Sequence, residues 1–255
     1  MKIGDAVNTD DIARMARRYL PRIAYDFIDG GVDGERGLVR NREAFERYRL
    51  VPRYLVDVEK RSQTASLFGH AYASPFGISP MSIAGFFRPG ADLMIARAAA
   101  AHDVPYIMSS ASCSSIESAA EAAPNNTWFQ VYGTRDPKIT VDLIARATRL
   151  NIRVLILTID TPVIGKRERN IRNGFRRPMK MTPGVIMQGL SRPAWTYRYL
   201  GEPRNSAHGK LGALCAPRSR RRYSRRPLRI ADAGARPDLG RAAAGPPALV
   251  RSPGG

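Results

Sequence analysis

The sequence predicts an α/β fold in which parallel strands alternate with helices behind an N-terminal helical segment. After Pro75, short apolar runs alternate with longer segments of helical periodicity, the pattern of consecutive strand–helix–strand units. The run VLILTI at 154–159 is almost continuously apolar, as expected for a strand that is buried on both faces of a parallel sheet. We therefore expect four strands with three intervening helices.

The N-terminal helical segment is predicted over residues 7–48. Its first helix contains DDIARMARRY, for which Thr9 or Asp10 can supply the N-terminal cap. Acidic residues at that end also suit the positive end of the helix dipole.

A second helix is predicted from about Pro21, because apolar residues recur from there at helical spacing. It should stop at Gly30-Gly31, where a glycine can adopt the left-handed conformation that ends many helices. A third, weaker helix is predicted over 36–47.

The strand–helix units follow. The predicted strands are 75–79, 105–109, 128–132 and 152–160, and the predicted helices are 91–102, 115–123 and 136–150. No regular helix is expected directly after the fourth strand, because a long basic and Met-rich stretch, 169–200, takes its place.

The C-terminal segment has a different composition. The formal net charge is +19, and residues 206–255 hold 11 of the 41 Lys and Arg residues but only 2 of the 22 Asp and Glu residues. In that segment 33 of 50 residues are Arg, Ala, Gly or Pro, which leaves too little apolar surface to offset the entropy of ordering. We expect disorder there, and a frameshift or early end near 200–210. The predicted divisions are 1–74 (helical lead-in), 75–200 (strand–helix units) and 201–255 (basic tail).

Several classes of protein are not expected. No run of 18 apolar residues predicts a membrane-spanning helix, and the first residues do not form a secretory signal. Cys113 and Cys215 are far apart, which favours a reduced, cytoplasmic protein, and no Cys/His cluster has the spacing of a metal site.

Six sequence blocks together resemble one family. The blocks are AYDFIDGGVDGE (24–35), NREAFERYRLVPRYLVDV (41–58), ISPMSIAG (78–85), MSSASCSSIES (108–118), WFQVY (128–132) and LTIDTPVIGKRERNIRNGF (157–175). In order and spacing they resemble the FMN-dependent α-hydroxy-acid oxidases and dehydrogenases over residues 8–200. The resemblance implies a TIM-type (β/α)₈ barrel, of which this chain would hold about four βα units, and an FMN cofactor.

The resemblance also implies substrate-binding and catalytic roles. Tyr25 would bind the carboxylate of a small 2-hydroxy acid, Tyr132 would face the substrate, and Arg167 would lie near it. Asp160 would pair with a catalytic histidine.

The cofactor-binding residues implied by the resemblance are Pro80, Met81, Ser82, Ser109, Gln130 and Thr158. Ser109, Gln130 and Thr158 also lie at or near the C-terminal ends of predicted strands, where TIM-barrel active sites are built. Taken singly, each of these residues also fits an ordinary strand or turn.

The rest of the family's machinery is not found in the sequence. The resemblance implies a lysine on a fifth strand, a histidine base followed by Gly-Gly-Arg, and phosphate-binding arginines on the last two strands. The histidines of this chain, His70, His102 and His208, do not stand in that pattern. We therefore expect this chain to be inactive alone and to bind FMN poorly.

Two further questions stay open at this level. Residues 161–200, called loop four below, would either contact a membrane peripherally at its inner face, as in the mandelate and lactate branch, or form a disordered active-site loop. The alternative function is a non-enzymatic nucleic-acid-binding protein that uses RSRRRYSRRPLR (218–229), although a wrong reading frame explains this run better. Family members are often homo-oligomers.

Overall fold

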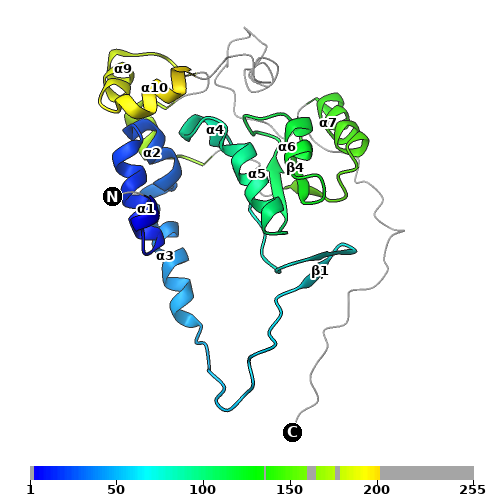
Figure 1. The fold of residues 1–255 in the computed structure, drawn as a ribbon. Helices are drawn as coiled ribbons and strands as arrows, with labels where there is room; N and C mark the ends of the chain where they lie inside the picture. Colours follow the sequence, from blue (N-terminus) through cyan, green and yellow to red (C-terminus); the bar gives the residue numbers. More distant parts are fainter. Residues whose placement is uncertain (1–2, 135, 160–164, 176–178, 202–255) are drawn as a thin grey trace, which may run out of the picture. The chain divides into compact units, whose positions relative to one another are not determined.

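The computed structural model describes residues 3–134, 136–159, 165–175 and 179–201 (Figure 1). By their contacts, all of these residues belong to one compact unit. The expectations for residues 202–255, including disorder and nucleic-acid binding, lie outside the described residues.

A parallel sheet forms the centre of this unit. Strands β3 (Tyr106–Ser109), β4 (Thr127–Tyr132) and β5 (Leu155–Thr158) pair in chain order, each parallel to the next. This order and the three strand positions confirm the prediction. Each neighbouring pair is joined by a helical connection, as parallel strands require.

The first predicted strand, 75–79, is not a full strand: it forms a single β-bridge at Ile78. The predicted length of this strand was therefore wrong. Ile78 pairs with Tyr106, its amide donating to the carbonyl of Pro105 at 2.8 Å. Pro75 and Pro80 flank the bridge, and neither has an N–H with which to lengthen a ladder.

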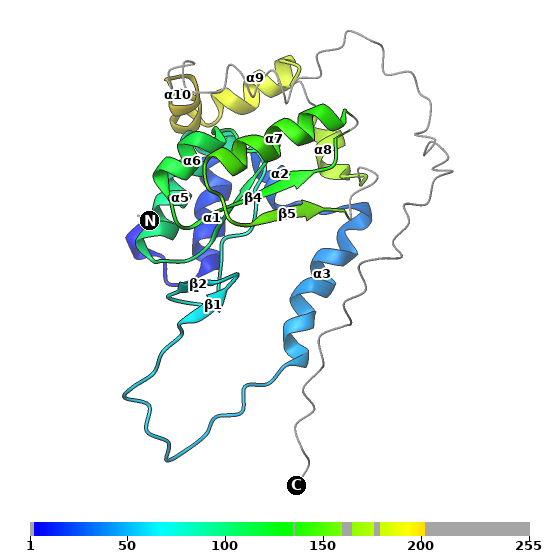
Figure 2. The same ribbon diagram turned by 90° about the vertical axis from the view of Figure 1, so that its right-hand side faces the viewer.

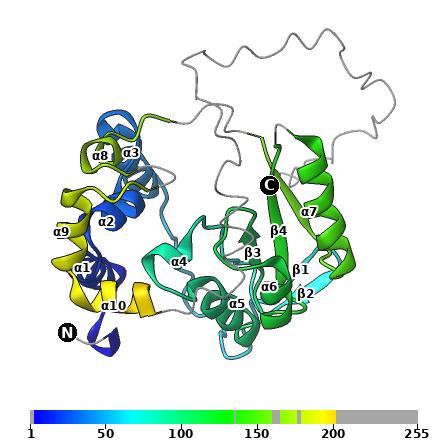
Figure 3. The same ribbon diagram turned by 90° about the horizontal axis from the view of Figure 1, so that it is seen from above.

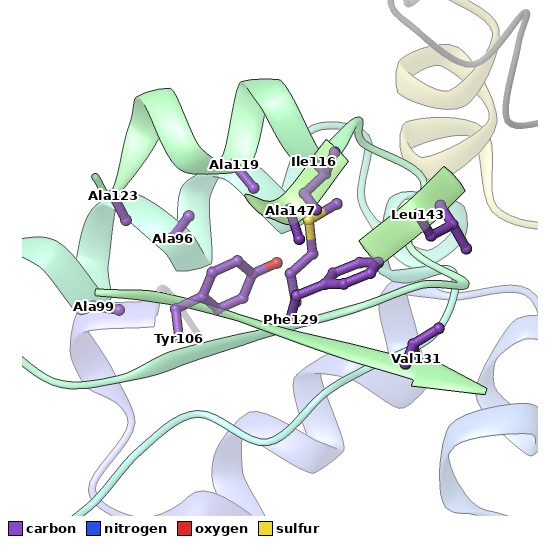
Figure 4. Packing of buried hydrophobic residues seen from close by; sticks show 11 residues of the cluster. Ala96, Ala99, Tyr106, Ile116, Ala119, Ala123, Phe129, Val131, Leu143 and Ala147 are labelled. Carbon is purple, nitrogen blue, oxygen red and sulfur yellow. The ribbon is translucent and has the colours of Figure 1, made fainter. Parts of the chain in front are cut away.

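The three predicted helices cover one face of the sheet. Helices α5 (Ala91–Ala101), α6 (Ile116–Ala122) and α7 (Pro137–Arg149) lie on the same face of the sheet (Figure 2) and pack against β3 and β4. Alternate strand residues point into this layer, and the small alanines of the helices allow close approach (Figure 4). The buried cluster consists of Ala96, Ala99, Tyr106, Met108, Ile116, Ala119, Ala123, Phe129, Val131, Leu143 and Ala147.

A hairpin packs against the opposite face of the sheet. Strands β1 (Ala65–Leu67) and β2 (His70–Tyr72) are antiparallel, and the indole N–H of Trp128 donates to the hydroxyl of Tyr72 at 2.9 Å. The two turn residues, Phe68 and Gly69, have φ of 51° and 79°, as a type I′ turn requires. The sequence did not predict this hairpin, because phenylalanine is an unusual residue for such a turn.

The N-terminal helices begin close to their predicted positions. Helix α1 (Thr9–Tyr19) follows a short 3₁₀ turn at Ile3–Asp5, and its cap is Asn8, not Thr9 or Asp10. The side chain of Asn8 accepts the amide hydrogen of Asp11 at 2.9 Å. The predicted caps were therefore one and two residues late.

Helix α2 (Arg22–Asp29) ends at Gly30 as predicted, but for another reason. Gly30 has φ −82° and ψ 145°, which is extended and not left-handed. A Cβ at this position would lie 2.4 Å from the carbonyl oxygen of Asp26, so close approach excludes a side chain. A 3₁₀ turn (Asp33–Glu35), α3 (Arg36–Glu43) and a second 3₁₀ turn (Ala44–Arg47) complete the predicted third helix.

Loop four is largely helical where it is described. Helices α8 (Glu168–Asn173), α9 (Pro183–Leu190) and α10 (Pro193–Gly201) gather with α1 and α2 (Figure 3). A proline stands in the first turn of α9 and of α10, where its missing N–H costs nothing. The prediction that this stretch lacks regular helix was wrong.

Trp195 fixes α10 against the rest of this helical group. Its ring is buried beside Phe86, and its indole N–H points to the carbonyl oxygens of Phe86 and Phe87, the nearer at 3.1 Å. These two residues belong to α4 (Ala84–Phe87), a helix that the sequence did not predict. Trp195 also stacks on Tyr199, with ring centroids 4.9 Å apart.

Replacing Phe129 tests the sheet–helix core. Phe129→Ala should lower the free energy of unfolding by about 3–5 kcal/mol, because it leaves a cavity where the ring now fills the helical layer. Phe76→Ala, at an exposed phenylalanine outside this layer, is the matched control and should change it by less than about 0.5 kcal/mol. Urea unfolding measures both, and equal losses would contradict the packing described.

Candidate functional site

The candidate site lies where the three parallel strands end. Ser109 ends β3, Tyr132 ends β4 and Thr158 ends β5, while Gln130 is two residues before the end of β4. The register pairs Ser109 with Gln130 and Tyr132 with Thr158. Since side chains alternate across a strand, these four residues share one face, opposite the helical layer.

Gln130 is the most constrained of the four. Its side chain is buried, and its Nε2 donates to Oγ1 of Thr158 at 2.7 Å. Its Oε1 is also buried and accepts no hydrogen bond from the residues that the structure describes. A buried acceptor without a donor costs free energy, so this oxygen marks a place where a ligand N–H would be stabilised.

The turn after β3 brings the Pro80–Ser82 segment to the same edge. The amide of Ser110 donates to the carbonyl of Gln130 at 2.8 Å, and the hydroxyl of Ser109 accepts from the amide of Ala111 at 3.1 Å. The carbonyl of Ala111 in turn accepts the amide hydrogen of Ile83. Met81 is exposed and Ser82 is half-buried, so both are accessible beside this turn.

Tyr25 lies on α2 and takes part in a charged network. Its hydroxyl donates to Oδ1 of Asp29 at 3.3 Å, and burial, reinforced by the Asp29 charge, raises the pKa of Tyr25 above its usual value. Arg169 of α8 donates to Asp29 at 2.7 Å and also pairs with Glu35. Glu35 accepts the amide hydrogen of Gly31 at 3.1 Å. This network ties α8 to the end of α2.

Arg167 approaches the same helix. Its Nη1 donates to the carbonyl of Phe27 at 2.9 Å, and its guanidinium lies 5.0 Å from the centroid of the Phe27 ring. Tyr25 and Arg167 are thus brought to one helix. Among the described residues, no hydrogen bond or ion pair joins either of them to Gln130, Tyr132 or Thr158.

A pocket of about 770 Å³ opens beside Tyr25. Five arginines, two aspartates and Leu20 line it with Tyr25. The arginines and aspartates are Arg17, Arg22, Arg169, Arg172, Arg192, Asp26 and Asp29. Sequence reasoning missed the pairing of Arg169 with Asp29. Both residues stand in blocks that were recognised, but a sequence does not show which of several arginines reaches a helix some 140 residues away.

Expectations from the sequence also concern Asp160, metal binding and membrane-spanning helices. Asp160 lies outside the described residues. No group of His, Cys, Asp and Glu in the described ranges could hold a metal ion. Within the same ranges, no helix is long and apolar enough to cross a membrane.

Comparison with known families gives a match over most of the chain. A family model described as FMN-dependent dehydrogenase matches residues 16–227, past residue 200, where we expected the resemblance to end. (S)-Mandelate dehydrogenase of Pseudomonas putida is 34% identical over 193 residues, covering 76% of this chain and 49% of that protein. Glycolate oxidase 1 of Zea mays is 35% identical over 180 residues, covering 71% and 49%. The chain thus spans about half the length of these relatives.

Solved structures agree with the sequence matches. The crystal structure of the monotopic membrane protein (S)-mandelate dehydrogenase superposes with a TM-score of 0.73 at 33% identity, covering 78% of this chain and 53% of that chain. A mandelate oxidase structure superposes with a TM-score of 0.64 at 32% identity, covering 74% and 59%. The matching structures are TIM barrels, of which the described residues form an unclosed part. The chain therefore belongs to the FMN-dependent α-hydroxy-acid dehydrogenase family.

Proposed function

We propose that this chain supplies the flavin-ring side of an FMN-dependent 2-hydroxy-acid oxidoreductase site, which the second half of the family's fold completes. The observation that carries the proposal is the buried Oε1 of Gln130, which has no donor among the described residues. Ser109 and Thr158 flank it on the neighbouring strands, at the edge where TIM barrels build their sites.

The side chains at this edge fit a flavin ring. The polar edge of a flavin alternates carbonyl acceptors with an N–H donor, and the free oxygen of Gln130 suits that N–H. Because Nε2 of Gln130 is held by Thr158, the amide is already oriented. The Pro80–Ser82 segment would approach the ring from the neighbouring turn. FMN, when bound, would accept the electrons that leave the substrate α-carbon.

The remaining residues would act on the substrate. Tyr132, at the exposed end of β4, and Tyr25 would hold the hydroxyl and carboxylate of the acid, with Arg167 nearby. The raised pKa of Tyr25 keeps its hydroxyl protonated, and so able to donate, throughout the neutral range. Asp160 would orient the imidazole of a histidine base and stabilise its cationic form.

Activity would require groups from the second half of the fold. By the family resemblance, the histidine base, the lysine near the flavin and the arginines for the FMN phosphate would come from that half. A phosphate that carries about −1.5 to −2 charge needs such cations or helix N-termini. We therefore expect weak FMN binding and no turnover from this chain alone.

A chimera tests the proposed function. Residues 1–200, continued by the second half of the P. putida (S)-mandelate dehydrogenase, should bind FMN and be reduced by a 2-hydroxy acid under anaerobic conditions. In that chimera Gln130→Leu should weaken FMN binding about 10-fold, because one buried hydrogen bond is worth about 1–3 kcal/mol. Fluorescence titration of FMN measures this, with exposed Gln63→Leu as control. Unchanged affinity in Gln130→Leu would contradict the flavin contact.

The role of Tyr25 can be separated from that of Gln130. In the same chimera, Tyr25→Phe should raise KM for the acid about 10-fold and leave kcat within about threefold, if its hydroxyl holds the carboxylate equally in ground and transition states. FMN affinity should not change. Steady-state kinetics gives both constants, and an unchanged KM would remove Tyr25 from the substrate site.

A second proposal concerns loop four. We propose that the exposed apolar side chains of α9 and α10 contact a membrane surface peripherally. The residues are Ile186, Met187, Leu190, Tyr197 and Leu200, each more than one third exposed. Apolar side chains gathered on surface helices favour burial at a lipid interface, and basic residues nearby favour anionic lipid. The similar (S)-mandelate dehydrogenase is described as a monotopic membrane protein.

Vesicle flotation tests this surface. The chain should float with vesicles containing anionic lipid, and Met187→Asp combined with Leu190→Asp should reduce the floating fraction at least about fivefold, because charge is costly in an apolar interface. Val39→Asp combined with Val51→Asp, at exposed valines elsewhere, is the control. Equal flotation of all forms would exclude the α9–α10 surface.

A further inference from the structure

The hydroxyl of Tyr25 is held by a carboxylate of its own helix. Tyr25 and Asp29 lie one turn apart on α2, and the hydroxyl donates to Oδ1 of Asp29 at 3.3 Å. Hydroxyl donors to a carboxylate usually approach to about 2.5–2.7 Å, so this bond is long and easily exchanged. The carboxylate of a bound 2-hydroxy acid would need the same hydroxyl hydrogen. Asp29 would therefore compete with any acid that binds at Tyr25.

Arg169 partly neutralises the charge of Asp29. Its Nη1 donates to Oδ2 of Asp29 at 2.7 Å, which is the oxygen that does not accept from Tyr25. The other nitrogen of the guanidinium, Nη2, pairs with Glu35, whose Oε1 accepts the amide hydrogen of Gly31 at 3.1 Å. Two carboxylates from different elements thus hold Arg169 in place.

The three side chains line one pocket and act on one another. Tyr25, Asp29 and Arg169 all line the pocket of about 770 Å³. Burial is the main reason that the pKa of Tyr25 is raised; Asp29 raises it further, and the charges of Arg17 and Arg169 oppose this. An anion beside the Tyr25 hydroxyl would experience the same charges, because Asp29 repels it and the arginines attract it.

We propose that Asp29 and Arg169 are positioning residues that set the affinity of Tyr25 for the carboxylate of a 2-hydroxy acid. Asp29 orients the hydroxyl until the acid binds and then releases it, and Arg169 stabilises the charge that Asp29 retains. The inference rests on the proposed function, because it takes Tyr25 as the residue that binds the carboxylate. Since Arg169 belongs to α8, the position of that helix would govern the affinity for substrate.

Calorimetric titration of the full 255-residue chain with (S)-mandelate tests the proposal. Asp29→Asn should tighten mandelate binding about fivefold, because it removes a like charge beside the ligand carboxylate. Arg169→Gln should weaken binding about fivefold, because it leaves the charge of Asp29 without its partner. In the Asp29→Asn background, Arg169→Gln should change the affinity less than about twofold, because Arg169 acts through Asp29.

Two matched controls remove the same charges from the same pocket. They are Asp26→Asn and Arg172→Gln, whose side chains also line it. Asp26 pairs with Arg22, and Arg172 pairs with Glu168. Neither Asp26 nor Arg172 bonds to Tyr25 in the described part of the chain. Each control should therefore change mandelate affinity less than about twofold.

The pKa of Tyr25 is a readout that a merely structural role would not move in two directions. In a chain labelled with ¹³C at tyrosine Cζ, the signal that Tyr25→Phe removes reports this pKa. It should fall in Asp29→Asn, which removes a negative charge, and rise in Arg169→Gln, which removes a positive one. Arg169→Lys, which keeps the charge, should stay close to the unmodified chain.

The outcomes separate this inference from the proposed function. If the unmodified chain does not bind mandelate, or if Asp29→Asn and Arg169→Gln bind it no differently from the two controls, the proposal is overturned. An equal effect of Arg169→Gln with and without Asp29 would also overturn it, because Arg169 would then act on the ligand directly. The role of Tyr25 in the proposed function is decided separately, by the KM of the Tyr25→Phe chimera.

Discussion

Strand β4 is held along both edges and on both faces, and the other elements of the described sheet take their places from it. Its edges pair with β3 and β5, while Phe129 and Val131 on one face fill the helical layer. On the other face Trp128 bonds to the hairpin, and Gln130 reaches Thr158. Because side chains alternate along a strand, the register of β4 decides which of its side chains face the helical layer and which face the candidate site. A shift of the register by one residue would exchange the two sets of side chains.

The α2 helix carries Tyr25, and a network of charged side chains joins the end of this helix to α8. Arg169 joins Asp29 to Glu35, and Glu35 accepts the amide hydrogen of Gly31. Tyr25 donates to the same Asp29. A substrate carboxylate at Tyr25 would therefore compete for the tyrosine hydroxyl with the carboxylate of Asp29, whose charge Arg169 partly neutralises. Because Arg169 belongs to loop four, this loop can influence Tyr25 through that ion pair.

The central sheet and its three helices were predictable, because continuous apolar runs and helical periodicity are local signals. The segment 75–79 failed as a strand because its flanking prolines limit pairing, and the hairpin was missed because Phe68 adopts a conformation rare for that residue type. Helices α8–α10 were missed because their apolar residues pack on distant partners, as Trp195 does on α4. The resemblance implied Gln130 and Thr158 as separate cofactor contacts. It did not predict the hydrogen bond between them, because that bond depends on strand register, which no local sequence pattern encodes.

Strand β4 should be the last element of the described fold to open. Native-state hydrogen exchange, followed residue by residue in increasing denaturant, measures this directly. The amide of Phe129, which donates to the carbonyl of Val154, should exchange only through global unfolding, and the α9 amides should exchange through smaller local openings. If the β4 amides exchanged through openings of the same free energy as the α9 amides, β4 could not be the strand on which the rest of the sheet depends.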